Sequence, residues 1–197
     1  MARFVLKDPF YKKAKEEGFR ARSAYKLKEI DAKYHVIKKG DVVMDLGCSP
    51  GSFLQVLSDM VGEQGHVIGI DILPTPYLPR KNVKTVKADI REINIAEVIA
   101  EYGLTETDVV TCDIAPNLSG IREVDDARIE DLFHCVLDIV AKALKPGGNF
   151  IIKSFSTTIQ KGIAEALKPC FGKVSQYKPP ASRAVSSEIF FVCIGKK

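Results

Sequence analysis

From residue 41 onward, short apolar runs with the composition of β-strands alternate with amphipathic runs that have the periodicity of α-helices. The runs expected as strands are residues 41–47, 66–72, 83–89, 108–114, 149–155 and 187–195, with a shorter candidate at 173–179. The runs expected as helices are residues 52–61, 93–102, 126–144 and 157–168. Because parallel strands need a long crossover connection, this alternation predicts an α/β fold with a mostly parallel sheet and helices on both faces.

The pattern departs from strict alternation at its two ends. The last two strand candidates are joined without a long helix, which predicts an antiparallel hairpin at one edge of the sheet. Before the first strand, residues 8–18 and 23–37 have the pattern of two helices. Within the alternating part, the KPGG sequence at 145–148 is expected to stop the helix before it, because proline and glycine do not continue a helix.

The chain of 197 residues is long enough for one well-packed domain, and it has no internal repeat, low-complexity stretch or linker. Its content of 46% hydrophobic and 27% charged residues is typical of a folded globular protein. We therefore expect a single domain over residues 1–197, with residues 1–40 as a basic helical segment packed on it. We also expect a monomer.

Several classes of protein are disfavoured by features that the sequence lacks. No apolar run approaches the roughly 18 residues that span a membrane, and the N-terminus has no apolar signal-peptide core. We therefore expect a cytoplasmic protein without a membrane partner. The five cysteines form no CxxC pair and the three histidines are scattered, so we expect neither disulfides nor a bound metal.

Basic residues are concentrated in two stretches of the chain. Residues 1–40 contain 12 Lys/Arg and 5 Asp/Glu, and residues 172–183 contain three cations and no acid. Aromatic residues accompany both stretches, namely Phe10, Tyr11, Tyr25, Tyr34 and Tyr177. A solvated basic face would explain the charge alone, whereas cations mixed with aromatic rings also suit phosphate contacts and base stacking, which makes a nucleic acid a candidate partner.

Ionisable side chains recur at the ends of five consecutive strand candidates. They are Asp45, which Gly47 follows closely, and then Asp71, Asp89, Asp113 and Lys153. In an open parallel sheet the carboxyl ends of the strands meet at one rim, where ligands bind. Contact with water would explain one polar strand end, but five of them at one rim are better explained by a binding site.

The sequence DLGCSPGSF at residues 45–53 has the composition of a strand, a glycine-bearing turn and a helix start. Gly47 permits a tight turn, and Gly51 would let a ligand approach the backbone at the open amides of the helix. Asp71 follows Gly51 by 20 residues, the spacing at which a carboxylate reaches a ribose diol. An ordinary strand-to-helix turn is the alternative, but the spaced acid favours a cofactor that contains adenosine.

The glycine pattern separates two kinds of cofactor. Dinucleotide sites use three glycines in a GxGxxG sequence, whereas here Pro50 intervenes and the third glycine is missing. A nicotinamide-dependent oxidoreductase is therefore disfavoured. S-adenosylmethionine has no phosphates, and its sulfonium and ammonium groups suit a rim lined by acids.

Lys153 lies in the apolar run NFIIKSF at residues 149–155. Burying a lysine costs free energy unless the amine is paired or neutral. Because a neutral amine can accept a proton, we interpret Lys153 as a general base. A lysine that extends from the strand end to water is the alternative.

Five stretches of the sequence resemble one known family. They are RARSAYKLKEI (20–30), DLGCSPGSF (45–53), DIAPNLSG (113–120), IIKSF (151–155) and KPPASRAVSSEIFFV (178–192). In this order they are similar to the motifs of FtsJ-like RNA ribose 2′-O-methyltransferases. The resemblance implies a Rossmann-like class I S-adenosylmethionine-dependent methyltransferase fold, with a seven-stranded, mostly parallel sheet whose last strand is antiparallel.

The resemblance also implies roles for individual residues. A catalytic constellation of two lysines and two acids falls on Lys26, Asp113, Lys153 and Glu188. Contacts with the cofactor fall on Gly51, Phe53, Asp71, Asp89 and Asp113, in addition to Asp45 and Gly47 at the first strand end. Phe53 stands where many members have tryptophan, and Cys48 where alanine is common, so we expect altered cofactor affinity with activity retained.

What the resemblance implies as function is transfer of a methyl group from S-adenosylmethionine to a ribose 2′-hydroxyl of RNA. A uridine of large-subunit (23S-type) ribosomal RNA, naked or in the subunit, is the leading substrate, and tRNA is the alternative. A non-enzymatic RNA-binding protein has no need of a lysine in an apolar strand and is disfavoured. If the basic stretches bind RNA, deletion of residues 1–22 is expected to weaken RNA binding and leave cofactor binding nearly intact.

Overall fold

The computed structural model describes residues 9–116, 119–155, 159–183 and 186–197. Its helices are α1 (Pro9–Glu16), α2 (Ser23–Tyr34), α3 (Ser52–Val61), α4 (Ile95–Glu101), α5 (Arg122–Ala143) and α6 (Gln160–Leu167). Its strands are β1 (Val42–Leu46), β2 (His66–Asp71), β3 (Val83–Lys87), β4 (Thr107–Cys112), β5 (Leu144–Phe155), β6 (Phe171–Tyr177) and β7 (Glu188–Lys196). Every predicted strand and helix has a counterpart, although residue 8 of the first predicted helix and residues 157 and 158 of the last lie outside the described residues.

The seven strands form one sheet in the order β3-β2-β1-β4-β5-β7-β6. Strands β1 to β5 pair in parallel, whereas β7 is antiparallel to both of its neighbours, β5 and β6. The predicted edge hairpin is therefore β6–β7, with its second strand inserted between β6 and β5. The mostly parallel α/β sheet with an antiparallel last strand is confirmed.

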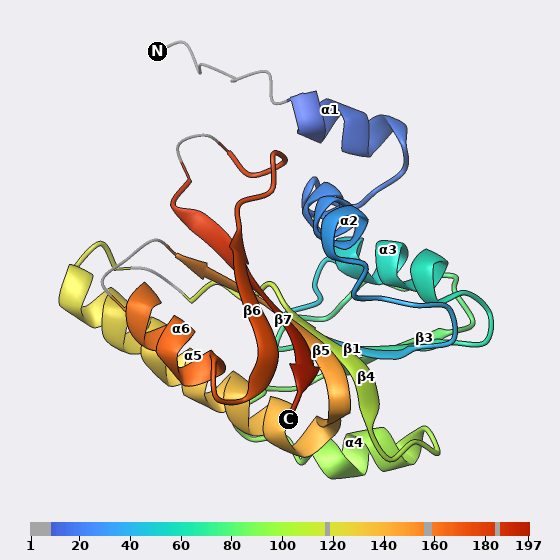
Figure 1. Ribbon diagram of the computed structural model, residues 1–197. Coiled ribbons are helices and arrows are strands. Elements are labelled where there is room, and N and C mark those ends of the chain that lie inside the picture. Colours follow the sequence, from blue (N-terminus) through green and yellow to red (C-terminus); the bar gives the residue numbers. More distant parts are fainter. Residues whose placement is uncertain (1–8, 117–118, 156–158, 184–185) are drawn as a thin grey trace.

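Helices cover both faces of the sheet (Figure 1). Helices α2 and α3 lie over one face, and α4, α5 and α6 lie over the other. Successive side chains of a strand point to opposite faces, so each strand contributes to two cores. In β1, Val43 packs with α2 and α3, whereas Met44 and Leu46 pack in the core on the α4–α6 side.

Helix α2 ends at Tyr34, three residues earlier than predicted, for a local reason. His35 adopts a left-handed conformation with a φ of 52°, which breaks the helix. The carboxylate of Asp31 then accepts hydrogen bonds from the amides of Val36 and Ile37. The chain therefore leaves the helix within one turn and runs towards β1.

The connection from α5 to β5 is tighter than the sequence suggested. Helix α5 ends at Ala143, in agreement with the stop predicted at 145–148, but β5 begins directly at Leu144. The pairing of β4 with β5 shifts register between Thr107 and Val109 of β4. The KPGG sequence therefore forms an irregularity within the strand rather than a separate loop.

Two cysteines that the sequence placed in strands, Cys112 and Cys193, are buried there. Burial raises the pKa of the Cys112 thiol to about 12, so it behaves as a small hydrophobic side chain. Among the described helices, none combines the length and the apolar character needed to cross a bilayer.

Candidate active site

The register of the sheet brings the predicted polar strand ends to one edge. Leu46 of β1 is level with Cys112 of β4, and Cys112 is level with Ile152 of β5. The residues that follow these three are Gly47, Asp113 and Lys153. These residues therefore meet at one edge of the sheet although up to 106 positions separate them in the chain.

A cleft of about 600 Å³ opens at this edge. Its walls come from the segments that follow β1, β2, β3 and β4 and from the side of α5. Its volume is in the range of sites that hold small-molecule cofactors. Four of the predicted cofactor residues line it, namely Gly47, Asp71, Asp89 and Asp113.

Gly47 forms the turn after β1 and has a φ of +79°, which side chains with a Cβ rarely adopt. A Cβ at this position would lie 2.4 Å from Cγ1 of Ile114, which also lines the cleft. Only glycine therefore lets the turn after β1 pass this close to the segment after β4.

The carboxylates of Asp71 and Asp89 both line the cleft, but they have different hydrogen-bond partners. The carboxylate of Asp71 accepts hydrogen bonds from the amides of Ser49 (2.9 Å) and Leu73 (2.8 Å), which ties the turns after β1 and β2 together. The carboxylate of Asp89 is held by the side chain and the amide of Arg91. These hydrogen bonds lower the pKa of Asp89 to about 2, so it is negatively charged at neutral pH.

Asp45 is fully enclosed behind this rim, and it is not among the residues that line the cleft. Its Oδ1 accepts a hydrogen bond of 2.7 Å from the hydroxyl of Thr111, and its Oδ2 is buried without a hydrogen-bond partner in the described residues. Burial, together with the charges of Asp113 and Asp71, raises the pKa of Asp45 to about 8 despite the bond from Thr111. Asp45 is therefore mainly protonated at neutral pH, unlike Asp89.

Gly51 and Phe53 lie away from the cleft wall. Gly51 precedes α3 with a φ of +102°, and the space that a Cβ would fill is occupied by the guanidinium of Arg20. Phe53 is 3% exposed and packs in the core between α2, α3 and the sheet. Direct contact of these two residues with a cofactor stays a prediction.

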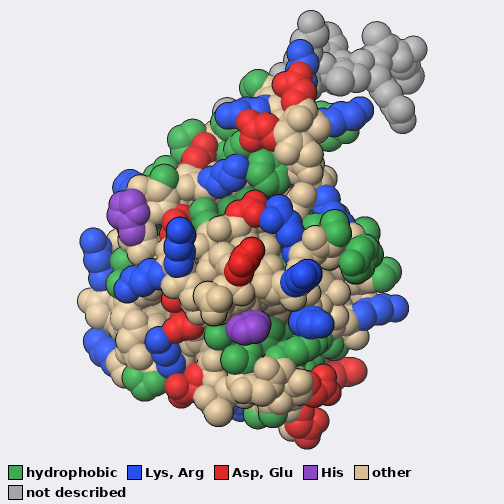
Figure 2. All heavy atoms as spheres, turned by 90° about the vertical axis from the view of Figure 1, so that its right-hand side faces the viewer, with side chains coloured by type: hydrophobic (Ala, Val, Ile, Leu, Met, Phe, Trp, Pro, Cys, Tyr) green, Lys and Arg blue, Asp and Glu red, His purple; other side chains and the backbone are tan. Residues whose placement is uncertain are grey.

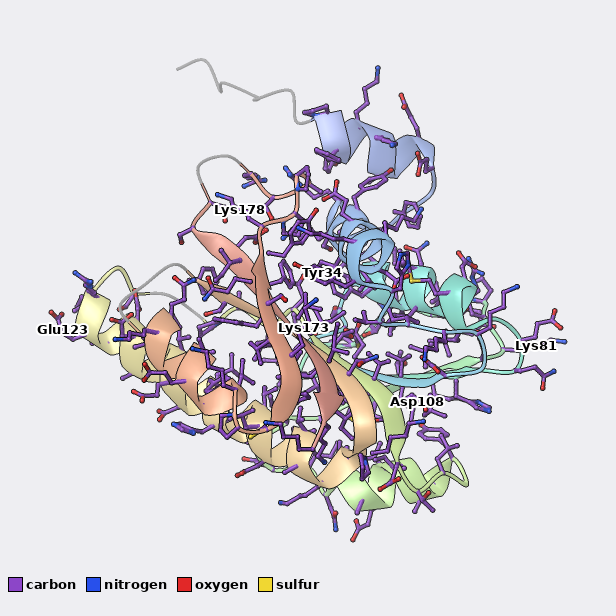
Figure 3. All side chains as sticks on the ribbon, viewed as in Figure 1. Tyr34, Lys81, Asp108, Glu123, Lys173 and Lys178 are labelled. Atoms are coloured by element: carbon purple, nitrogen blue, oxygen red, sulfur yellow. The ribbon has the colours of Figure 1, made fainter. Side chains whose placement is uncertain are left out.

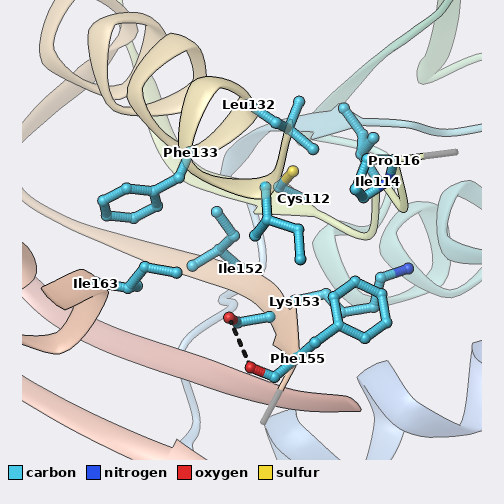
Figure 4. A pocket seen from close by; sticks show the side chains of 11 residues that line it. Cys112, Ile114, Pro116, Leu132, Phe133, Ile152, Lys153, Phe155 and Ile163 are labelled. Atoms are coloured by element: carbon cyan, nitrogen blue, oxygen red, sulfur yellow. Dashed lines mark hydrogen bonds between the residues drawn. The ribbon is translucent and has the colours of Figure 1, made fainter. Parts of the chain in front are cut away.

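Lys153 and Asp113 form an ion pair with an Nζ–Oδ1 distance of 2.9 Å. The amine also donates a hydrogen bond to the backbone carbonyl of Asp113. Figure 4 shows that the aliphatic part of Lys153 lies beside apolar side chains and that its nitrogen points away from Phe133 and Ile163. With a side chain only 8% exposed, Lys153 is a paired, nearly buried lysine and does not extend freely into water.

Lys26 and Glu188 form a second ion pair, with an Nζ–Oε1 distance of 2.6 Å and side chains 11% and 12% exposed. The hydroxyl of Ser182 donates to the same oxygen at 2.7 Å. Burial alone would raise the pKa of Glu188, but the hydrogen bonds from Lys26 and Ser182 and the charges of Lys26 and Lys153 outweigh it and lower that pKa. Glu188 is therefore ionised at neutral pH.

The two ion pairs lie on the same face of the sheet. In the antiparallel pair β5–β7, Lys153 is opposite Phe190, and Glu188 is two residues from Phe190 along β7. Residues two apart in a strand point to the same face, which here is the face that α2 covers. Helix α2 brings Lys26 to within 5.9 Å of the centre of the Phe190 ring. The four predicted catalytic residues thus come from α2, β5, β7 and the end of β4.

Sequence reasoning missed three side chains around this site: Arg91, Ser182 and Arg20. Arg91 is only two residues from Asp89, but a pair within a loop has no periodic signal in the sequence. Ser182 reaches Glu188 across an irregular segment, and the side-chain contacts of Arg20 lie 30 to 57 positions further along the chain. No local pattern could have identified these two.

The chemistry of the cleft fits S-adenosylmethionine. The carboxylates of Asp71, Asp89 and Asp113 can accept hydrogen bonds from hydroxyl and amino groups and can balance a sulfonium or an ammonium. Within the described ranges, no group of three His, Cys, Asp or Glu residues is arranged to hold a metal ion.

Comparisons with known proteins agree on one family. A family model described as FtsJ-like methyltransferase matches residues 19–196. The ribosomal RNA large subunit methyltransferase E of Bdellovibrio bacteriovorus is 41% identical over 192 residues, which cover 97% of each chain. The protein of the same name from Methanothrix thermoacetophila is 46% identical over 97% of this chain and 72% of its own.

Solved structures share the fold. A proposed ribosomal RNA methyltransferase of Plasmodium falciparum superposes with a TM-score of 0.79 at 26% identity, over 90% of this chain and 98% of that chain. Fibrillarin of Aeropyrum pernix, crystallised with natively bound S-adenosylmethionine, superposes with a TM-score of 0.58 over 87% of this chain and 73% of its own. At 16% identity, the likeness to fibrillarin concerns the fold alone.

Proposed function

The chain belongs to the FtsJ-like methyltransferase family, and we propose that it transfers a methyl group from S-adenosylmethionine to a ribose 2′-hydroxyl of large-subunit ribosomal RNA, with a uridine as the acceptor. The observation that carries the proposal is the convergence of the Lys153–Asp113 and Lys26–Glu188 ion pairs beside an acid-lined cleft. The names of the curated relatives support the class of RNA. We also propose that the chain forms a single domain, since one sheet contains the first strand and the last. The proposed place of action is the cytoplasm.

When bound, S-adenosylmethionine supplies the methyl group on its sulfonium. Asp71 would hold the ribose hydroxyls and Asp89 the rest of the adenosine, because both are carboxylates at the cleft wall. Asp113 would face the cationic part of the cofactor. Gly47 would form the floor of the site, with Asp45 as a neutral group beneath it.

Lys153 is proposed as the general base. A ribose hydroxyl is a poor nucleophile, and a base improves it by taking the proton as the oxygen attacks. Both partners of the amine, the carboxylate and the carbonyl of Asp113, are hydrogen-bond acceptors. These two acceptors fix where the nitrogen lies. Once the ammonium has lost a proton, the neutral amine has a lone pair that can receive the proton of the ribose hydroxyl.

Lys26 is proposed to keep positive charge near the ribose and its phosphate. Glu188 holds the ammonium at 2.6 Å, and the low pKa of Glu188 means that this partner stays ionised. The hydroxyl of Ser182 is a second hydrogen-bond donor to the carboxylate of Glu188 and helps to hold it in place. In this assignment Lys26 and Glu188 orient the RNA, and Lys153 and Asp113 perform the proton transfer.

The two basic stretches are proposed to bind the RNA, and they are adjacent in space. The amide of Ala181 donates to the carboxylate of Glu29 (2.9 Å), and the guanidinium of Arg22 donates to the carbonyl of Ala181. Nearby, the ammonium of Lys33 lies 4.4 Å from the ring centre of Tyr177. Figure 3 shows Lys178 beyond the end of β6, on the side of the N-terminal helices. Helix α2 and the segment after β6 therefore form one surface beside the catalytic residues.

The aromatic residues of these stretches divide into buried and exposed groups. Tyr25 is 5% exposed and packs with Phe10 and Phe19, so its ring supports the fold and cannot stack on a base. Tyr11 is 64% exposed, so a base can reach part of its ring from solvent. Of the aromatic residues singled out in the sequence, Tyr11 therefore suits the proposed role best.

The proposal is tested by methyl transfer to defined RNAs. The protein is incubated with S-adenosylmethionine carrying a labelled methyl group and with 23S-type RNA, intact large subunits or tRNA. Nuclease digestion and mass spectrometry then locate the label. We expect one ribose-methylated uridine in the 23S-type RNA or in the subunit, and none with the Lys153→Ala variant. Label on a base, or in tRNA alone, would overturn the proposed function.

A further inference from the structure

The side chain of Arg20, three residues before the start of α2, joins its own segment to two other parts of the chain. Its Nη1 donates hydrogen bonds to the carbonyls of Pro50 and Pro76, each at 2.8 Å, and its Nη2 donates to the carbonyl of Tyr77 at 2.6 Å. Pro50 belongs to the glycine-bearing turn before α3, and the other two belong to the irregular segment between β2 and β3. A planar guanidinium with several donors can bridge carbonyls in this way, and a lysine ammonium cannot match the geometry.

The backbone around Arg20 is itself attached to α3. The amide of Arg20 donates to Oε1 of Gln55 at 2.9 Å, and Nε2 of Gln55 donates to the carbonyl of Gly18 at 2.9 Å. A further contact joins the hydroxyls of Ser23 and Ser52, 2.7 Å apart, at the first residues of α2 and α3. Arg20 is therefore held in place from both sides, so its guanidinium can act as a fixed anchor.

The segment that Arg20 anchors forms part of the cleft. Residues 72–80 contain no helix or strand, and Ile72 and Leu73 at the start of the segment line the cleft although their side chains are 58% and 59% exposed. An irregular segment without buried side chains depends on backbone hydrogen bonds for its position. The hydrogen bonds from Arg20 therefore contribute directly to the shape of this wall.

Gly51 is the residue that makes room for the anchor. A Cβ at Gly51 would lie 2.7 Å from Nη1 of Arg20. A side chain of the protein thus approaches the same glycine that the sequence suggested as a point of ligand approach. The turn before α3, the segment after β2 and the N-terminal segment thus share one contact.

We propose that Arg20 is a positioning residue that fixes residues 72–80 at the cofactor cleft and couples cofactor binding to RNA binding by the N-terminal segment. The coupling rests on the proposed function, whereas the anchoring does not. RNA that contacts α1 and α2 would favour the anchored arrangement of residues 72–80, and cofactor binding would favour the same arrangement. Because such coupling is reciprocal, each ligand then raises the affinity for the other by the same factor.

The anchor also changes the interpretation of an N-terminal deletion. Removal of residues 1–22 would remove Arg20 with the basic residues, so the expectation that cofactor binding stays nearly intact does not follow from these contacts. Substitution at Arg20 alone separates the two effects. The substitutions Arg20→Lys, which keeps the charge, and Arg20→Ala are compared with Lys84→Ala, which removes an exposed cation from β3 outside the cleft wall.

Hydrogen exchange of the free protein tests the anchor without any ligand. We expect faster amide exchange in residues 72–80 for both Arg20 variants, with unchanged exchange in β1 and β4, and wild-type behaviour for Lys84→Ala. Unchanged β1 and β4 show that the variants fold. Exchange of residues 72–80 at the wild-type rate in both Arg20 variants would overturn the proposal, whatever the activity of the protein.

Calorimetry with S-adenosylmethionine, with and without RNA, tests the coupling. We expect the Kd of both Arg20 variants to rise about tenfold, the effect of losing a hydrogen bond to a charged group. RNA should lower the Kd of the wild type and of Lys84→Ala, but not that of the Arg20 variants. An RNA effect of the same size in the Arg20 variants would overturn the coupling. A wild-type protein that binds no S-adenosylmethionine, with the exchange result as expected, would refute the proposed function and the coupling but not the anchor.

Discussion

At the scale of single residues, the acids at the carboxyl edge of the sheet differ in charge because they differ in surroundings. Asp89, partly exposed and hydrogen-bonded to Arg91, has its pKa lowered to about 2, whereas Asp45, enclosed with one donor, has its pKa raised to about 8. The site therefore combines the charged carboxylate of Asp89 at its surface with the neutral carboxyl group of Asp45 beneath it. A rim of uniformly ionised acids would place repelling charges in a medium of low polarity.

The raised pKa of Asp45 predicts a pH dependence of stability. The folded state holds the proton to about pH 8, and the unfolded chain releases it near pH 4, so this contribution to stability is complete below pH 4 and is lost as the pH rises to 8. The free energy of unfolding should fall from pH 5 to 8 by at most about 1.4 kcal/mol per pH unit for this proton. In Asp45→Asn, urea denaturation should give a flatter profile. Identical slopes for both proteins would show that Asp45 does not titrate in this range.

Substitution of Lys153 distinguishes a base from a fixed positive charge. Lys153→Ala should lower kcat by at least about 10²-fold, the usual contribution of a general base, with S-adenosylmethionine and RNA affinity largely unchanged. Lys153→Arg should also fail, because a guanidinium remains protonated. Single-turnover rates and calorimetry measure the two effects. Near-normal turnover of the arginine variant would leave Lys153 with an electrostatic role only.

At the scale of elements, α2 joins the parts of the site. Its first residue contacts the start of α3, Lys26 in the same first turn pairs with Glu188, and Glu29 holds the backbone of the segment after β6. One helix therefore sets the positions of groups from both halves of the sheet. A change in the tilt of α2 would alter the Lys26–Glu188 ion pair and the proposed RNA surface together.

The Lys26–Glu188 pair, which we propose acts in catalysis, is also expected to contribute to stability, and a double substitution separates the two roles. Lys26→Met leaves the ionised Glu188 enclosed without its partner, which should lower the free energy of unfolding by about 2–4 kcal/mol. Adding Glu188→Gln removes that charge and should restore much of the stability without restoring methyl transfer. Urea denaturation and a methylation assay measure the two. Recovery of activity in the double variant would show that neither charge is needed.

The elements were more predictable from the sequence than their mutual contacts. Strand and helix patterns depend on neighbouring residues, so β1 to β7 and α1 to α6 could be located, and the rim formed by Asp71, Asp89 and Asp113 followed from the parallel topology. The pairing of Lys26 with Glu188 came only from a family resemblance, because it depends on the β5–β7 register and on how α2 docks. The burial of Phe53 could not be predicted, because it depends on how α2 and α3 pack on the sheet, which residues distant in the sequence determine.

At the scale of the whole molecule, charge is distributed unevenly. On the face seen in Figure 2, basic side chains are widely spread and acidic side chains lie among them, so this face offers no continuous basic surface. The proposed RNA surface depends instead on cations gathered where α2 meets the segment after β6. Phosphate contacts made there should release counterions and make RNA affinity depend on salt.

Charge reversal tests the location of the RNA surface. The double variant Lys33→Glu and Lys178→Glu should weaken RNA binding and reduce the salt slope of log Kd by about 2, roughly one per lost phosphate contact. The control is Lys81→Glu, which Figure 3 places on the opposite side of the molecule and which should bind nearly as the wild type does. Filter binding at 50–200 mM salt measures both. A larger effect from Lys81 would locate the RNA on the other side.

The insertion of β7 between β5 and β6 has a consequence for how the protein is made. A ribosome synthesises β7 after every other strand of the sheet, yet its residues 190–193 are 0% exposed and fill the space between two strands already made. Until they emerge, β5 and β6 have no neighbour to pair with on their facing edges. The nascent chain therefore cannot bring Glu188 to Lys26, and the site is complete only when β7 has left the exit tunnel.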